Sequence, residues 1–66
     1  MTIRLNGEVR TLPHVMTVAE LLRRLDIDAQ LVAVEMNRVV VKRARYADTP
    51  VTDGAEVEIV AFVGGG

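Results

Sequence analysis

Apolar and polar residues alternate along several short stretches of this chain, and in one stretch the apolar spacing changes to that of a helix. Near the start, Ile3 and Leu5 alternate with polar neighbours, which indicates a strand with one buried face. Asn6-Gly7 follows, and both residue types tolerate the positive φ of a tight turn. Residues 2 to 12 therefore predict a β-hairpin.

The register of this hairpin can be predicted from the side chains that would face each other. A plain two-residue turn would set Ile3 opposite Arg10 and so mix apolar and charged side chains on one face. A shift of one residue exchanges the two faces and pairs Ile3 with Val9. We therefore expect a β-bulge at Asn6-Gly7.

The clearest helix signal covers residues 17 to 25. Thr17 and Glu20 form a T-x-x-E capping box, in which each side chain satisfies a free backbone N–H of the other residue. Met16 precedes the cap and is placed to pack on Leu21 as a hydrophobic staple. An apolar stripe with the spacing i, i+3, i+4 and i+7 is formed by Val18, Leu21, Leu22 and Leu25.

The second half of the chain predicts three further strands. Residues 31 to 41 are rich in apolar residues and break at Asn37-Arg38, where asparagine suits a left-handed turn. We expect two short strands there, and three consecutive valines predict that both faces of the second are partly covered. A polar connection follows, with Tyr46 expected in the core beneath it. Asp53-Gly54 marks a turn before a last strand from about Glu56 to Val63.

These elements occur in the order β-β-α-β-β-irregular-β, with one helix and no linker that would divide the chain. This order predicts an α+β domain of two layers, with a mixed sheet of four to five strands packed on one main helix. We expect a single domain over residues 1–63 and a flexible glycine tail over residues 64–66.

The last residues of the sequence contribute almost nothing to a core. Gly64, Gly65 and Gly66 follow directly on an apolar, β-rich run. Glycine has no Cβ and loses the most conformational freedom on ordering, and three extended residues span roughly 10 Å. The triplet fits either a frayed terminus or a thin arm that carries a carboxylate into a narrow channel.

Val60 and Phe62 form an apolar step directly before the tail. In the first half of the last strand, Glu56 and Glu58 make one face charged, whereas from Val60 onward both faces are apolar. Two interpretations stay open. The pair belongs to a core covered by the helix, or it is a docking patch that leads a partner to the tail.

Composition argues against several classes of function. The chain has no cysteine and one histidine, His14, which argues against disulfides, thiolate zinc sites and nucleophilic thiols. A net charge of −1 and few aromatic residues do not suit nucleic acid. The opening residues lack an apolar h-region, and no run approaches the ~20 apolar residues of a membrane span. We expect no metal, no nucleic acid, no membrane partner and a cytoplasmic location.

The ordered set of these segments resembles the ubiquitin-like β-grasp sulfur carriers, and among them the ThiS family of thiamin biosynthesis. The resemblance covers essentially the whole chain and depends on residues 3–7, 17–22, 34–37 and 53–60 together with the glycine tail. Ala55 is a small departure, because the family often has an acidic residue after Asp-Gly. The resemblance implies a β-grasp fold.

The resemblance also implies that the chain is a protein co-substrate and not an enzyme. An E1-like adenylating enzyme (ThiF-like) would use ATP to adenylate the carboxylate of Gly66. A sulfur donor such as a cysteine desulfurase would displace AMP to leave a thiocarboxylate, and thiazole synthase (ThiG-like) would receive the sulfur. Gly64 and Gly65 would thread the partner's active site, and the chain itself would bind no cofactor.

Two alternatives to this role stay open. The first is a sulfur carrier for another pathway, similar to the small subunit of molybdopterin synthase, although those chains are usually longer. The second is a ubiquitin-like modifier or a plain interaction module.

Overall fold

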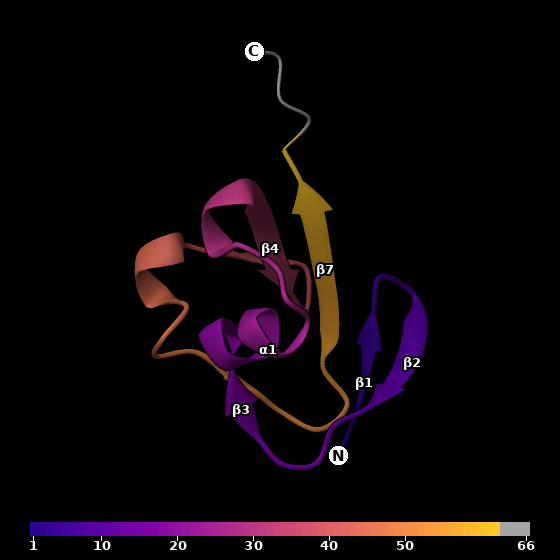
Figure 1. Cartoon of the computed structure of the whole chain (residues 1–66). Coiled ribbons are helices and arrows are strands. Elements are labelled where there is room, and N and C mark those ends of the chain that lie inside the picture. Colours follow the sequence, from indigo (N-terminus) through magenta and orange to yellow (C-terminus); the bar gives the residue numbers. More distant parts are fainter. Residues whose placement is uncertain (63–66) are drawn as a thin grey trace.

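The computed structural model describes residues 1–62, and these form a mixed five-stranded sheet with one α-helix packed on one face (Figure 1). The strands of this sheet are β1 (Thr2–Leu5), β2 (Glu8–Thr11), β4 (Val32–Met36), β5 (Val39–Val41) and β7 (Glu56–Ala61). The other elements are β3 (Met16–Thr17), α1 (Val18–Arg24), the 3-10 turns η1 (Ala29–Leu31) and η2 (Arg43–Arg45), and β6 (Pro50–Val51). The predicted α+β class is confirmed.

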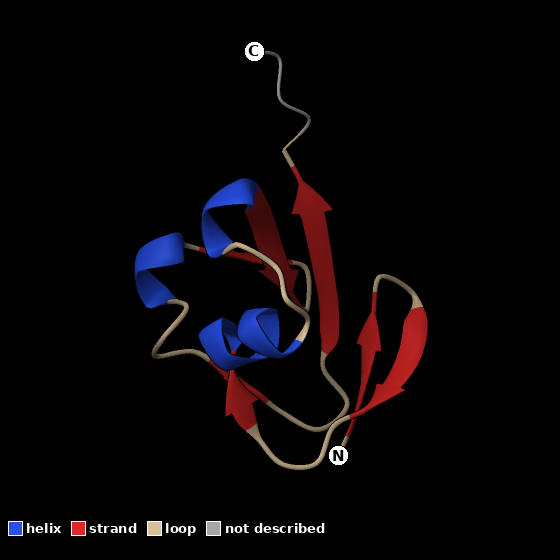
Figure 2. Ribbon diagram, in the orientation of Figure 1, coloured by secondary structure: helices blue, strands red, loops and turns tan. Residues whose placement is uncertain are grey.

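The strand order places β7 at the middle of the sheet. The order is β2-β1-β7-β4-β5, and β3 and β6 form a separate two-stranded ladder. β7 is parallel to β1 and antiparallel to β4, so the sheet is mixed (Figure 2). The strand that leads to the glycine tail is therefore held by neighbours on both sides.

The helix begins at the predicted capping box. The N–H of Glu20 donates to the hydroxyl of Thr17 at 3.1 Å, and the N–H of Thr17 donates to the Glu20 carboxylate at 3.4 Å. α1 has seven residues, and the predicted range of 17 to 25 includes its two caps, Thr17 and Leu25.

The core lies between α1 and the sheet. Its central side chains are almost fully buried and come from both layers: Ile3, Val18, Leu21, Leu22, Val34, Val51 and Val57. Tyr46 is also buried, with 4% of its surface exposed, which confirms its predicted place under the polar connection. Apolar area removed from water in this way is the main stabilising contribution to a domain of this size.

The predicted bulge in the first hairpin is wrong. Asn6 and Gly7 have φ values of 49° and 82° and form a plain two-residue turn that sets Ile3 opposite Arg10. The mixed pairing is tolerated because β2 is an edge strand whose four residues are all exposed. The guanidinium of Arg10 lies 3.9 Å from the Glu8 carboxylate and remains in solvent.

The second hairpin confirms the predicted turn but not the predicted burial. Asn37 and Arg38 have φ values of 52° and 68° and join β4 to β5. Val39 and Val40 are each 66% exposed, so the expectation of partial cover on both faces is wrong for these two residues. The reason is that β5 is the outer strand of the sheet.

Candidate functional site at the end of strand β7

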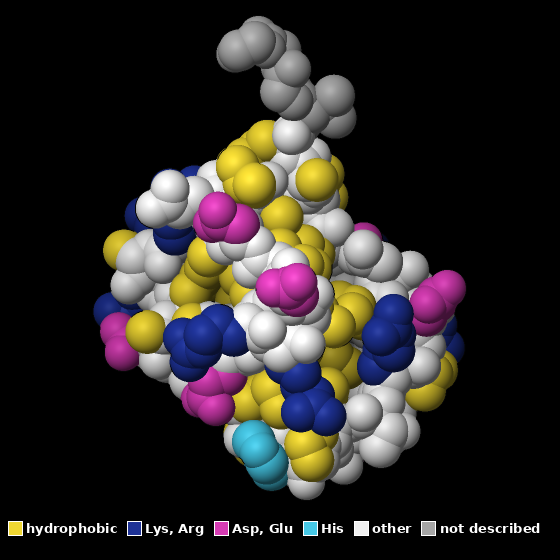
Figure 3. Space-filling view, viewed as in Figure 1, with side chains coloured by type: hydrophobic (Ala, Val, Ile, Leu, Met, Phe, Trp, Pro, Cys, Tyr) yellow, Lys and Arg dark blue, Asp and Glu magenta, His cyan; other side chains and the backbone are white. Residues whose placement is uncertain are grey.

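Two of the predicted site residues, Val60 and Phe62, lie near the end of β7, where the chain leaves the sheet (Figure 1). Val60 and Phe62 are within the described residues, whereas Val63, Gly64, Gly65 and Gly66 lie outside them. β7 ends at Ala61. Hydrophobic side chains gather at this end of the molecule (Figure 3).

Val60 and Phe62 are surface residues. Their side chains are 59% and 56% exposed, which excludes the interpretation that they belong to a core covered by the helix. Val60 lies opposite Ala33 and shares the outer face of the sheet with Glu58, whereas Val57 on the other face is buried. The docking interpretation of this apolar step is taken up below as a proposal.

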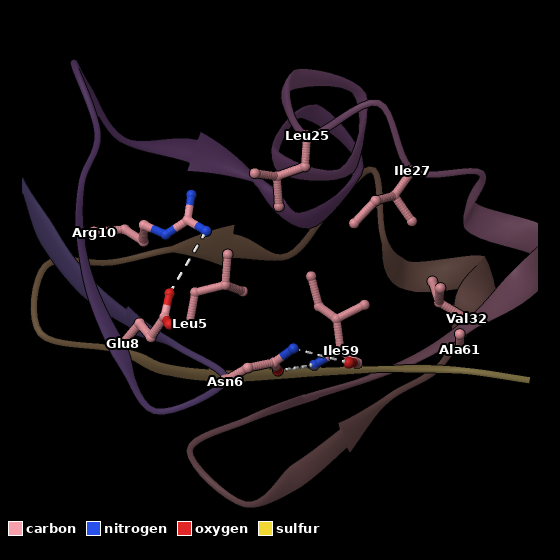
Figure 4. A pocket seen from close by; sticks show the side chains of 9 residues that line it. All are labelled: Leu5, Asn6, Glu8, Arg10, Leu25, Ile27, Val32, Ile59 and Ala61. Carbon is pink, nitrogen blue, oxygen red and sulfur yellow. Dashed lines mark hydrogen bonds and ion pairs between the residues drawn. The ribbon is translucent and has the colours of Figure 1, made fainter.

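Two asparagine side chains hold β7 in place from its two sides. The amide nitrogen of Asn6 donates to the carbonyl oxygen of Ile59 at 3.1 Å, and the N–H of Ile59 donates to the Asn6 amide oxygen at 2.7 Å (Figure 4). The N–H of Glu56 donates to the amide oxygen of Asn37 at 2.9 Å, and the N–H of Asn37 donates to the Glu56 carbonyl at 2.7 Å. Both asparagines have positive φ.

These contacts extend the hydrogen bonding of β7 beyond its strand partners. β1 pairs with β7 only at Arg4↔Glu56 and Leu5↔Val57, so Asn6 replaces the missing strand at Ile59. On the other side, the N–H of Phe62 donates to the carbonyl oxygen of Leu31 at 2.8 Å. The backbone is thus fixed up to Phe62.

A groove of about 590 Å³ lies beside β7 on the helix side of the sheet. It is lined mainly by apolar side chains with a polar end, and the residues are Leu5, Asn6, Glu8, Arg10, Leu25, Ile27, Val32, Ile59 and Ala61 (Figure 4). The groove exists because α1 ends at Arg24, which leaves Leu25 and Ile27 to cover this part of the sheet.

The opposite, helix-free face of the sheet carries an unusual pair of like charges. Glu58 of β7 lies directly opposite Glu35 of β4, and Val40 of β5 lies opposite Glu35 on its other side. A shallow hollow of about 410 Å³ on this face is lined by Glu35, Arg38, Glu56, Glu58 and Val60. Sequence reasoning missed this pair, because the register of two strands so far apart in sequence cannot be read from either alone.

The described residues offer little else of chemical note. His14 is exposed, and its Nδ1 lies 3.1 Å from the carbonyl oxygen of Val15. In residues 1–62 no group of three His, Asp or Glu side chains is placed to hold a metal ion. No helix in this part of the chain combines the length and the apolar character needed to cross a membrane.

Comparison with known proteins identifies the group to which this chain is similar. The model of the ThiS family matches residues 3–66. A solved structure of the thiamine biosynthesis protein ThiS from Geobacter metallireducens superposes with a TM-score of 0.88 and 38% identity, over 100% of both chains. This likeness confirms the predicted β-grasp fold.

The curated relatives include a protein of similar length and longer enzymes. The sulfur carrier protein ThiS of Bacillus subtilis is 34% identical over 65 residues, which are 97% of this chain and 98% of the relative. A thiazole synthase of Paramagnetospirillum magneticum is 47% identical over all 66 residues, but these make up 20% of its length. The chain thus spans about a fifth of the thiazole synthases that it matches. From the family match and the full-length relative, the chain belongs to the ThiS family.

Proposed function

We propose that this chain is a sulfur carrier of thiamin biosynthesis and that partner enzymes modify the carboxylate of Gly66. The observation that carries this proposal is the family match, which runs from residue 3 through Gly66 and so includes the glycine tail. The relative of the same length from Bacillus subtilis is named a sulfur carrier protein. On this proposal the chain is a co-substrate, not an enzyme.

The chemistry explains why a partner must activate the tail. A free α-carboxyl group has a reference pKa near ~3.5 and is ionised at pH 7, and a carboxylate is a poor electrophile. An E1-like enzyme would therefore form an acyl-adenylate on Gly66 from ATP, with release of pyrophosphate. The persulfide of a sulfur donor such as a cysteine desulfurase would then displace AMP to form an acyl disulfide, and a thiol would reduce this disulfide to release the thiocarboxylate. ATP is bound by the enzyme and not by the carrier.

The described part of the chain supports this role as a rigid base for the tail. Asn6 and the Leu31 carbonyl hold the backbone of β7 as far as Phe62. Gly64 and Gly65 carry no side chains, so the backbone can enter a channel that a Cβ would obstruct. The fixed backbone at Phe62 then sets the point on the folded surface from which the tail starts.

Thiazole synthase is the proposed acceptor of the sulfur. In the two thiazole synthases that the chain matches, a segment similar to all 66 residues is part of the same polypeptide. This linkage supports the proposal that the carrier and thiazole synthase act in one reaction sequence. Because adenylation consumes ATP, we place the carrier in the cytoplasm.

The proposal is tested by intact-mass measurement. The chain is incubated with the adenylating enzyme of the same organism, ATP and a cysteine desulfurase with cysteine. We expect a mass gain equal to the replacement of one oxygen by sulfur, and none when ATP is omitted. An unchanged mass in the complete mixture would contradict the proposal and favour a plain interaction module.

A second measurement separates the thiamin pathway from the alternative of molybdopterin synthesis. A strain from which the gene is deleted should require thiamin, and the thiazole alone should restore its growth. Growth without thiamin, combined with loss of molybdenum-dependent enzymes, would assign the carrier to the other pathway.

A further inference from the structure

The helix-free face of the sheet is uncovered along β7, β4 and β5. Val40 and Val60 on this face are 66% and 59% exposed, and Phe62 follows at its edge. Exposed apolar side chains that cluster on one face indicate a surface that another protein covers. This face is continuous with the apolar step that precedes the tail.

Glu35 and Glu58 lie at the centre of this face. They are directly opposite each other on neighbouring strands, an arrangement in which like charges destabilise a sheet. Within residues 1–62, the one ion pair with a nitrogen–oxygen distance of 4.0 Å or less joins Arg10 to Glu8. No Lys or Arg of the described residues therefore lies within 4.0 Å of the Glu35 or Glu58 carboxylate. Arg38 lines the same hollow but makes no ion pair within 4.0 Å with either carboxylate. The like-charge pair is therefore left without a close cation in the described residues.

We propose that Glu35 and Glu58 together bind one arginine or lysine side chain of the enzyme that adenylates the tail. Val40, Val60 and Phe62 would pack against apolar residues around that cation. The inference rests on the proposed function, because an enzyme that takes up the tail must approach the end of β7. A cation placed between the two carboxylates turns their repulsion into a charge-complementary contact. Screening of exposed charges by salt should then weaken the complex.

The test uses a variant that should raise the stability of the fold and weaken its binding to the adenylating enzyme. Glu35→Lys replaces the like-charge pair with a cross-strand pair of opposite charges, so we expect the Tm to rise by about 2–6 °C. We expect the dissociation constant for the adenylating enzyme, measured by titration calorimetry without ATP, to rise about tenfold or more. The wild-type constant should rise with salt concentration, and that of the variant should rise much less.

Asp48→Lys is the matched control, because it makes the same change in net charge on the exposed segment between η2 and β6. We expect its dissociation constant to stay within about twofold of wild type, since long-range attraction is screened at ordinary salt concentrations. Equal affinities of Glu35→Lys and wild type, or equal losses in both variants, would overturn the inference.

ATP–pyrophosphate exchange on the same samples separates this inference from the proposed function. Exchange with the wild-type chain, together with unchanged affinity in Glu35→Lys, would overturn the docking inference and leave the carrier function standing. Lack of exchange with the wild-type chain, together with weaker binding of Glu35→Lys, would contradict the carrier function and support the docking surface.

Discussion

Asn6 shows how one side chain can serve both a turn and a distant strand. Its positive φ closes the first hairpin, and its amide makes two hydrogen bonds to the backbone of Ile59, which is 53 residues away. Asparagine is one of the few residue types other than glycine that combines a left-handed conformation with a short polar side chain. The turn pattern therefore predicted the conformation of Asn6, but the partner of its amide depends on the tertiary structure.

Substitution of Asn6 separates these two roles. We expect Asn6→Gly to retain the turn and to lose about 1 kcal/mol of unfolding free energy with the amide bonds. Asn6→Ala also adds the cost of positive φ, so a total loss of about 2–3 kcal/mol is expected. Denaturant unfolding measures both values, and amide hydrogen exchange at Ile59 should become faster in each variant. Equal stability of the two variants would contradict the conformational part of the argument.

From the sequence, Val60 could belong either to the core or to an interface. Its exposure in the structure excludes the core. We expect Val60→Ser to change the unfolding free energy by no more than about 0.5 kcal/mol and to slow formation of the thiocarboxylate several-fold. Val15→Ser is a close control, because Val15 is also 59% exposed but lies in the loop between β2 and β3. A rate loss of equal size in both variants would argue against a docking role for Val60.

At the scale of elements, the helix and the strands of the main sheet lie within the ranges predicted for them, although β7 ends at Ala61 and was predicted to run to about Val63. Local signals are sufficient there, because the capping box marks Thr17 and the turns contain Asn6-Gly7, Asn37 and Asp53-Gly54. The errors concern strands at the edge of the sheet. An edge strand has no neighbour on one side, so the side chains of β2 and β5 can stay exposed. The predictions assumed that the apolar residues of these strands are buried, and they were therefore wrong.

The short ladder of β3 and β6 could not be predicted from local pattern. Each strand has two residues, and Pro50 in β6 reads as an interruption of regular structure. The pairing of Met16 with Val51 instead depends on the position of α1, which starts directly after β3. Contacts of this kind are set by packing between elements and not by the residues of either one.

The capping box of α1 provides a test at this scale. We expect Thr17→Ala to lower the unfolding free energy by about 1 kcal/mol, because the N–H of Glu20 loses its acceptor. In a domain of this size such a loss lowers the Tm by roughly 4–8 °C. Glu20→Gln keeps an acceptor for the N–H of Thr17 and should lose less. Thermal unfolding followed by circular dichroism measures both, and equal losses would contradict a specific role for the box.

At the scale of the whole molecule, residues 1–62 form a scaffold of a five-stranded sheet with a helix packed on it. The sequence predicted a domain over residues 1–63 and a glycine tail that carries the chemistry, and the tail lies outside the described residues. The sequence could not predict the Glu35–Glu58 pair, which exists only because β7 and β4 are neighbours in one register. A single amino-acid sequence does not reveal which residues of two distant strands lie opposite each other.

The division between scaffold and tail gives a further prediction. We expect deletion of Gly65-Gly66 to leave the far-ultraviolet circular dichroism and the Tm unchanged, because glycine has no side chain to add to the core that residues 1–62 form. The same deletion should abolish the mass gain in the complete sulfur-transfer mixture. Loss of folded structure in the shortened chain would show that the tail stabilises the domain.

The central place of β7 has a consequence for synthesis of the protein. Because β7 follows the other described strands in the sequence, the β1–β2 and β4–β5 hairpins have no central strand to join until it emerges from the ribosome. A product that stops short of Val57 lacks the strand between them and leaves two edges open to proteolysis and aggregation. Removal of such incomplete products therefore also removes molecules that lack the strand leading to the glycine tail.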